Sequence, residues 1–129
     1  MNYYPRGKKS KYGAKKTVYD GITFDSKKEA RRACELNMLA SKGIIKDLRR
    51  QVKYTLIPAQ READTIGKRG GVIKGKLLER EVAYIADFVY YDTELQAEVV
   101  EDTKGVKTPE YIIKRKLMLY MHNIRIKEV

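Results

Sequence analysis

Two β-prone runs that follow each other closely constrain the fold of this chain most. The runs Leu77 to Tyr91 and Leu95 to Lys104 are rich in the Val, Tyr, Ile and Phe side chains that suit a half-buried sheet, and they meet near Asp92-Thr93. We expect the two runs to pair as antiparallel strands. The 129 residues leave room for one compact domain around them, and a hydrophobic share of 43% argues against a disordered chain.

Two segments carry the signals of helix ends. Ser26 can cap a helix that runs to about Ser41, and Gly43 follows it as a stop signal. Thr108 supplies a second cap and is followed by a first-turn proline, so a second helix should run from Pro109 to about His122. The two helices therefore flank the pair of strands along the chain.

The other segments complete the order of elements. Thr17 to Phe24 contains Asp-Gly between two short β-prone runs, which favours a small hairpin. Gln51 to Pro58 is predicted to be a strand, Ala59 to Lys76 a long, flexible, Gly-rich loop, and Ile124 to Val129 a last strand. The predicted domain, residues 17–129, thus has the order helix, three strands, helix, strand, in an α/β sandwich with a mixed sheet.

The charge balance indicates the class of partner. Lys and Arg number 28 against 17 Asp and Glu, which gives a net charge of +11. Such an excess attracts polyanions over long distances, so nucleic acid is the expected partner, and a merely solvated basic surface is the alternative. Residues 1–16 are polar, basic and interrupted by two glycines. They are predicted to form a flexible N-terminal arm that orders on a phosphate backbone.

Three features bear on the compartment. No apolar stretch approaches the roughly 20 residues that a membrane helix needs, and the start of the chain lacks the apolar core of a signal peptide. Cys34 is the only cysteine, so no internal disulfide is possible. We expect no membrane contact and an intracellular, reducing compartment.

Acidic residues in the predicted strands indicate a chemical site. Asp87 lies within an otherwise apolar strand, where an unpaired charge costs several kcal/mol unless a cation compensates it. Asp102 and Lys104 are two apart on the next strand, so both project from one face, roughly 6 to 7 Å apart, while Glu101 projects from the other. Clustered carboxylates that hold Mg²⁺ are a common device for phosphodiester hydrolysis, and a nearby lysine can stabilise the charge on the phosphate.

The order of these residues resembles that of a known family. A helical Glu, then a strand Asp, then Asp-x-Lys on the neighbouring strand is similar to the PD-(D/E)XK nucleases, although Ala86 stands where the name of the motif has proline. The segments that carry the likeness most closely are Gly21 to Ala30, Tyr84 to Phe88, Glu101 to Gly105, and Thr108 with Tyr111 and Ile113 to Lys116. They resemble a phage-encoded group of small nucleases that is described as Holliday-junction-resolvase-like.

The resemblance implies a fold, a cofactor and a set of roles. The fold would have a restriction-endonuclease-like core, and the reaction would be Mg²⁺-dependent cleavage of branched DNA, with Mn²⁺ as a possible substitute. The metal ligands would be Glu29, Asp87, Asp102 and the backbone carbonyl of Thr103, and Lys104 would be the catalytic lysine. A four-way junction has near twofold symmetry, so a homodimer is expected, in the cytoplasm of a bacterial host.

The residues expected to contact DNA are predicted partly from the family resemblance and partly from the distribution of positive charge. The resemblance places Lys114 on the second helix near the phosphate, and the charge pattern supplies the others. The full set is Arg6, Lys8, Lys9, Lys11, Lys15, Lys16, Lys68, Arg69, Lys74 and Lys114.

Alternatives remain open for each site residue and for the function. Glu29 also completes a capping box with Ser26, and Asp87 could pair with a buried Lys or Arg. Asp102 and Lys104 could form a surface ion pair of little consequence. At the level of function, the rival is a non-catalytic nucleic-acid-binding protein that retains the nuclease fold, and among nucleases a nicking, flap or replication-fork activity is a further possibility.

Overall fold

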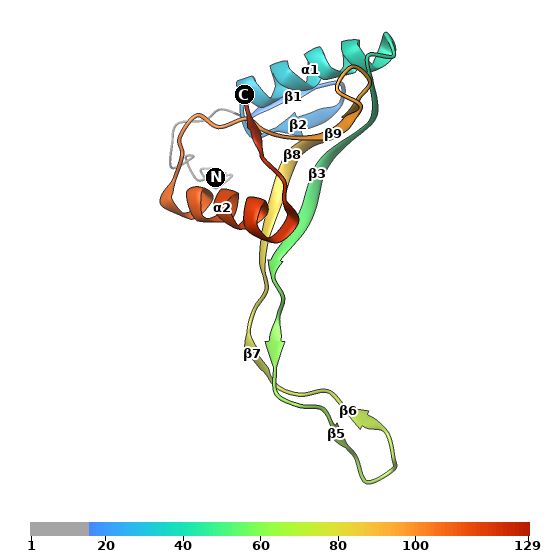
Figure 1. Cartoon of the computed structure of the whole chain (residues 1–129), viewed down its shortest axis with the longest axis vertical. Coiled ribbons are helices and arrows are strands. Elements are labelled where there is room, and N and C mark those ends of the chain that lie inside the picture. Colours follow the sequence, from blue (N-terminus) through green and yellow to red (C-terminus); the bar gives the residue numbers. More distant parts are fainter. Residues whose placement is uncertain (1–15) are drawn as a thin grey trace, which may run out of the picture.

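A four-stranded mixed sheet forms the centre of the computed structural model, which describes residues 16–129 (Figure 1). Its strands are β3 (Ile45–Ile57), β8 (Val82–Asp92), β9 (Ala97–Asp102) and β10 (Lys127–Glu128), in the order β10-β9-β8-β3. β8 pairs antiparallel with both β3 and β9, whereas β10 pairs parallel with β9. The α/β class, the mixed sheet and the antiparallel pair of strands are therefore confirmed.

Both predicted helices are present, with the predicted caps. Helix α1 (Lys27–Ser41) begins after Ser26, whose hydroxyl accepts a 3.1 Å hydrogen bond from the Glu29 N–H. Helix α2 (Pro109–His122) begins after Thr108, which accepts a 3.1 Å bond from the Tyr111 N–H. These bonds satisfy amides that the first turn of a helix leaves without a partner. None of the helices in residues 16–129 is long and apolar enough to cross a membrane.

The two helices cover opposite faces of the sheet. Phe88 and Val89 are neighbours on β8, yet Phe88 packs with α1 and Val89 with α2, because successive side chains of a strand point to opposite faces. The α1-side core comprises Phe24, Ala30, Ala33, Leu36, Ile45, Phe88 and Tyr90. The α2-side core comprises Leu56, Tyr84, Ala86, Val89, Val100, Tyr111, Met118 and Ile126.

The small N-terminal hairpin packs beside α1. Strand β1 (Thr17–Tyr19) pairs antiparallel with β2 (Ile22–Phe24). The turn residues Asp20 and Gly21 have φ of 50° and 72°, the left-handed conformations that a tight Asp-Gly hairpin turn requires. This hairpin is confirmed, and it anchors the start of α1 by burying Phe24.

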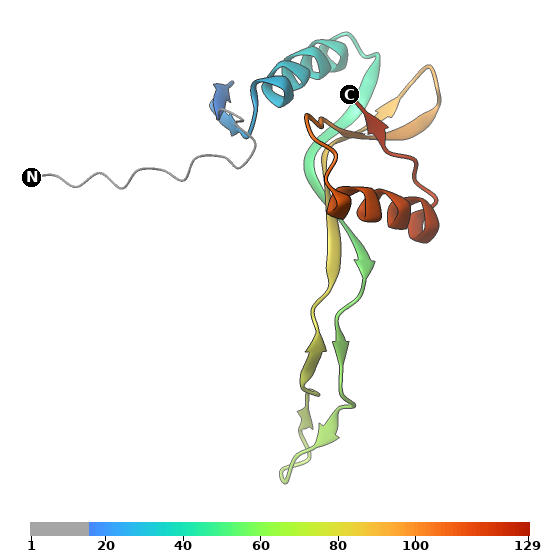
Figure 2. The same cartoon turned by 90° about the vertical axis from the view of Figure 1, so that its left-hand side faces the viewer.

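The predicted loop from Ala59 to Lys76 was wrong, because this segment belongs to a long two-stranded extension. β4 (Gln60–Arg61) pairs with β7 (Leu77–Glu79), and β5 (Thr65–Ile66) pairs with β6 (Val72–Ile73). Figures 1 and 2 show this hairpin extension, residues 58–81, continuing β3 and β8 away from the body of the protein. β3 itself is longer than predicted and begins at Ile45.

Candidate functional site

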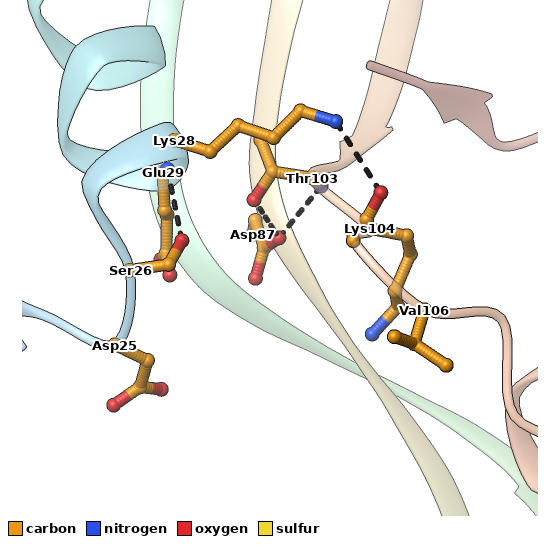
Figure 3. A pocket seen from close by; sticks show the side chains of 9 residues that line it. Asp25, Ser26, Lys28, Glu29, Asp87, Thr103, Lys104 and Val106 are labelled. Atoms are coloured by element: carbon orange, nitrogen blue, oxygen red, sulfur yellow. Dashed lines mark hydrogen bonds between the residues drawn. The ribbon is translucent and has the colours of Figure 1, made fainter. Parts of the chain in front are cut away.

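Most of the predicted site residues line one cavity. The cavity has a volume of about 370 Å³ and lies between the start of α1, the middle of β8 and the segment that follows β9 (Figure 3). The residues that line it are Asp25, Ser26, Lys28, Glu29, Asp87, Thr103, Lys104, Gly105 and Val106. Side chains from three separate parts of the chain therefore meet here, as the motif order predicts for Glu29, Asp87, Thr103 and Lys104.

Asp87 is held in place by the residue that follows β9. Its Oδ2 atom accepts hydrogen bonds from the Thr103 backbone N–H and the Thr103 hydroxyl, each 2.8 Å long (Figure 3). A carboxylate that accepts two such bonds has a fixed orientation. The structure therefore gives Thr103 a positioning contact, whereas the predicted role of its carbonyl as a metal ligand remains a prediction.

The alternation of side chains between the two faces of the sheet is interrupted in β8 at Asp87. Ala86 and Val89 are three residues apart, so strict alternation would place them on opposite faces, yet both belong to the α2-side core. Across the sheet, Gln51 of β3 has φ of 52°, a conformation that is uncommon for residues other than glycine. Irregular backbone of this kind is often found at functional sites. It leaves Asp87 between the two cores and facing the cavity.

The Glu29 carboxylate points toward the sheet. Its Oε1 atom accepts a 3.3 Å hydrogen bond from Gln51 Nε2 and lies 3.6 Å from Arg50 Nη2. The Ser26 half of the capping box is formed, but the carboxylate makes its contacts with β3. Burial raises the pKa of Glu29, and the nearby charges of Asp87 and Asp25 raise it further, while Arg50 lowers it. A cation in the cavity would offset this repulsion.

Asp102 lies beside the cavity, behind Lys104. It is 1% exposed, its Oδ2 accepts a 2.5 Å hydrogen bond from the Tyr84 hydroxyl, and its Oδ1 lies 3.3 Å from Lys104 Nζ. Within the described part of the chain, Oδ1 is buried without a hydrogen-bond partner. Burial raises the pKa of Asp102 to about 6; the charge of Asp87 adds to the rise, and the Tyr84 hydroxyl and Lys104 act against it.

Lys104 connects two neighbouring cavities. Its Nζ lies near Asp102 and 4.7 Å from the centre of the Tyr111 ring, and its backbone carbonyl accepts a 3.3 Å bond from Lys28 Nζ. The second cavity, of about 320 Å³, is lined by Lys104, Tyr111 and Lys114, among others. Because Lys114 lines the same cavity, the predicted phosphate-binding lysine lies near Lys104. Its Nζ atom also pairs with Glu110 at 3.3 Å. In the ion pair between Asp102 and Lys104 the carboxylate is buried while the lysine is partly exposed, so the pair is not fully on the surface.

The donor atoms suit a hard divalent cation, but they do not form a closed shell. Carboxylate oxygens are the ligands that Mg²⁺ prefers, and the buried Oδ1 of Asp102 has no hydrogen-bond partner among the described residues, although it lies 3.3 Å from Lys104 Nζ. Among residues 16–129, however, no group of three His, Cys, Asp or Glu side chains lies close enough to hold a metal ion. Glu29 and Asp87 face the cavity together, and Asp102 faces Tyr84 and Lys104.

Glu101 lies on the other face, as its position next to Asp102 predicts. It is fully buried, and it pairs with Arg32 at 2.5 Å and accepts a 2.7 Å bond from the Tyr90 hydroxyl. Burial alone would raise the pKa of Glu101, but the hydrogen bonds from Arg32 and Tyr90 lower it overall. Glu101 therefore stabilises the contact between α1 and the sheet and is not part of the cavity.

The predicted DNA-binding residues are spread over the molecule. Lys16 is exposed just before β1, and Lys68, Arg69 and Lys74 are exposed at the far end of the hairpin extension, away from the cavity (Figure 2). Among the members of this set that the structure describes, only Lys114 lies beside the site. The other predicted residues fall outside the described part of the chain: Arg6, Lys8, Lys9, Lys11 and Lys15.

Besides Lys28 and Val106 of the cavity lining, five further residues at the site were given no role from the sequence. Asp25 lines the cavity, Arg50 and Gln51 contact Glu29, and Tyr84 and Tyr111 surround Asp102 and Lys104. For Tyr84 a signal existed, because it lies on the same predicted strand as Asp87. For Arg50 and Gln51 none existed, because their position depends on the pairing of β3 with β8.

The raised pKa of Asp102 predicts a pH-dependent loss of stability in EDTA. Between about pH 4 and pH 6 the unfolded chain releases the Asp102 proton while the folded protein keeps it, so stability falls as the pH rises through this window. The shift from 3.8 to about 6 corresponds to about 3 kcal/mol. Urea unfolding at pH 4 and pH 7 should show stability changing less favourably with rising pH in the parent protein than in Asp102→Asn, because the lowered pKa values of Glu81, Glu101 and Glu128 act in the opposite sense in both proteins. Equal pH dependence of the two proteins would contradict the assignment.

Comparison with known families gives one match. A family model described as "Protein of unknown function (DUF1064)" matches residues 9–128. No curated protein and no solved structure gives a significant match.

Proposed function

We propose that this chain, which belongs to the DUF1064 family, is a metal-dependent endonuclease with a restriction-endonuclease-like core that cleaves branched DNA. The observation that carries the proposal is the shared cavity of Glu29, Asp87 and Lys104. Glu29 of α1, Asp87 of β8 and Lys104 of the segment after β9 meet in the order that the PD-(D/E)XK resemblance implies. The family match itself assigns no function.

The chain's own residues have distinct roles in this proposal. Glu29, Asp87, Asp102 and the Thr103 carbonyl would hold Mg²⁺ once they move closer together around it, and the bound ion would supply a Lewis acid and lower the pKa of water. Lys104 stabilises the negative charge that develops on the phosphate. Because Asp102 lies 3.3 Å from Lys104 Nζ, it also orients the lysine.

Two further residues position the acids. Thr103 fixes the orientation of Asp87 through two hydrogen bonds, and Gln51 holds the Glu29 carboxylate toward the sheet. Both contacts keep the carboxylates facing the cavity before any cation arrives, so less ordering is needed on binding.

The partners proposed are DNA and a second copy of the chain. The net charge of +11 supports a polyanionic substrate, because each phosphate that a Lys or Arg neutralises releases a counterion. A homodimer is supported by the apolar side chains that α2 exposes, namely Ile113 (58%), Leu119 (48%) and Tyr120 (83%). A symmetric dimer would bring two cavities to the two strands that a resolvase must cut.

A non-catalytic nucleic-acid-binding protein is the second candidate. The observation in its favour is that no three metal-binding side chains converge within residues 16–129. In that case the carboxylates would be a buried structural group, and the basic surface would be the functional part.

One experiment separates the two candidates. The protein is incubated with labelled four-way junction, linear duplex and single strands of the same sequence, in Mg²⁺, Mn²⁺ or EDTA. We expect products from the junction first, only with a divalent cation, because affinity for a branched substrate positions the cavity at the branch. Tight gel shifts without products in any cation would favour the second candidate. Preferential cleavage of nicked, flapped or linear DNA would support the nuclease assignment but show that branched DNA is not the substrate.

A further inference from the structure

The tip of the hairpin extension, residues 65–74, has a defined conformation. The Gly67 N–H donates a 2.8 Å hydrogen bond to the Gly71 carbonyl, and the Gly70 N–H donates a 3.0 Å bond to the Gly67 carbonyl. Just before the tip, the two strands pack so closely that a Cβ atom on Gly75 would lie 1.7 Å from the Glu62 carbonyl oxygen. The tip is therefore an ordered, hydrogen-bonded turn at the end of a long hairpin.

Apolar side chains are exposed at this tip. Ile66 and Val72 lie directly opposite each other on β5 and β6, and they are 79% and 74% exposed. Ile73, which is 56% exposed, packs next to Gly67, whose missing Cβ would lie 3.2 Å from the Ile73 Cδ1 atom. Exposed apolar clusters of this kind often mark a contact surface.

The tip is also cationic. Lys68, Arg69 and Lys74 are exposed there, and no acidic residue lies between Thr65 and Lys76. Asp64, the nearest acid before the tip, accepts a 2.8 Å hydrogen bond from the Gly75 N–H on the other side of the hairpin. The apolar pair is thus surrounded by positive charge.

Charge and size together favour DNA over a second copy of the chain as the partner of the tip. Two such tips would repel each other through their cations. Ile66, Val72 and Ile73 also offer far less than the roughly 800 Å² per partner that a stable protein interface buries. A phosphate backbone complements the cations, and apolar wedges flanked by Arg and Lys are known to insert between base pairs and kink the duplex.

We propose that the tip acts as a DNA wedge, in which Ile66 and Val72 insert between neighbouring base pairs while Lys68, Arg69 and Lys74 contact phosphates. This inference rests on the proposed DNA substrate. At about 3.3 Å per residue, the strands place the tip roughly 50 Å from Gln51 and the cavity. The wedge therefore acts on a part of the substrate that is separate from the cleaved bond.

The test uses four-way junctions that carry 2-aminopurine at successive positions along their arms, because this base fluoresces more strongly when it is unstacked. Binding is measured in EDTA, so that the readout does not depend on cleavage. The variant Ile66→Ser/Val72→Ser removes the wedge, Lys68→Ala/Arg69→Ala removes phosphate contacts, and Leu95→Ser is the control. Leu95 is 67% exposed in the turn between β8 and β9, at the opposite end of the molecule.

We expect the parent protein and Leu95→Ser to raise the fluorescence at one or two positions. The serine pair should abolish that rise and weaken binding about tenfold, the effect of losing one base-stacking contact. The alanine pair should weaken binding and flatten its salt dependence. Unchanged fluorescence and affinity in the serine pair would overturn the wedge. The wedge would also be overturned if the parent protein is a dimer and the two serine substitutions make it a monomer, because the tip would then be a protein interface. If the parent gives the fluorescence signal but never cleaves DNA in any cation, the wedge stands and the nuclease proposal fails.

Discussion

Lys104→Ala should reduce the rate of junction cleavage at least about a hundredfold, which corresponds to some 3 kcal/mol of transition-state stabilisation. The ammonium group lies near Asp102 and the Tyr111 ring, and Lys104 lines the cavity, so its charge is close to where the phosphate would bind. Junction binding should stay within a few fold, because affinity comes from many phosphate contacts elsewhere. The measurement is single-turnover cleavage together with a binding titration.

The matched control for this variant is Lys107→Ala. Lys107 lies three residues further along the chain, outside the cavity lining, and pairs with Glu128 at 2.9 Å. The Lys107→Ala variant therefore loses one positive charge, as Lys104→Ala does, but not from the cavity. Asp102→Asn should also abolish cleavage, and it should bind the junction at least as tightly as the parent, since a negative charge near phosphate is removed. Parental cleavage by either Lys104→Ala or Asp102→Asn would take that residue out of the mechanism.

Glu29→Gln should slow cleavage at least about tenfold, or some 1.4 kcal/mol, and leave the unfolding free energy in EDTA within about 1 kcal/mol of the parent value. Glutamine keeps the shape of the side chain and an oxygen for Gln51 Nε2, and it removes the repulsion from Asp87 and Asp25. A neutral amide is, however, a poor ligand for a hard cation. Thermal melts with and without Mg²⁺ should show that most of the metal-induced stabilisation is lost.

Ser26→Ala separates the helix cap from the chemistry. The Ser26 hydroxyl accepts the Glu29 N–H, so its loss should cost about 1 kcal/mol of stability. Cleavage should be largely retained at a temperature where the variant is folded. If Glu29→Gln instead kept the parental rate across a titration of Mg²⁺ and Mn²⁺, the glutamate would be structural, and the metal site would have to be formed by Asp87 and Asp102.

Local signals in the sequence predicted most of the fold. Ser26 and Thr108 cap their helices, and Asp-Gly forms the first hairpin, because each of these acts through hydrogen bonds or dihedral angles within a few residues. The hairpin extension was missed because its strands are short and exposed and the segments between them are rich in glycine, so no buried periodic pattern marks them. It is held by contacts across the hairpin, such as the bond from Gly75 to Asp64, which a local pattern does not reveal.

The sequence predicted that some of the proposed site residues would be neighbours, but it did not predict their arrangement. The motif order places Glu29, Asp87 and Lys104 together, and the cavity that they line confirms that they are neighbours. The sequence could not show that Asp102 is buried behind Lys104. Nor could it show Gln51 at its positive φ, because this depends on the pairing of β3 with β8 at the point where the strands change face.

Single-turnover cleavage of a labelled four-way junction by the parent protein, in Mg²⁺ and in EDTA, tests the central claim most directly. Asp87→Asn is the control, because the charge of Asp87 acts on both other acids and raises the pKa of each. We predict that the parent cuts the junction in Mg²⁺, that EDTA stops the reaction, and that Asp87→Asn binds the junction without cutting it. A parent protein that binds but yields no product in any divalent cation, or an Asp87→Asn variant that cuts at the parental rate, would contradict the claim.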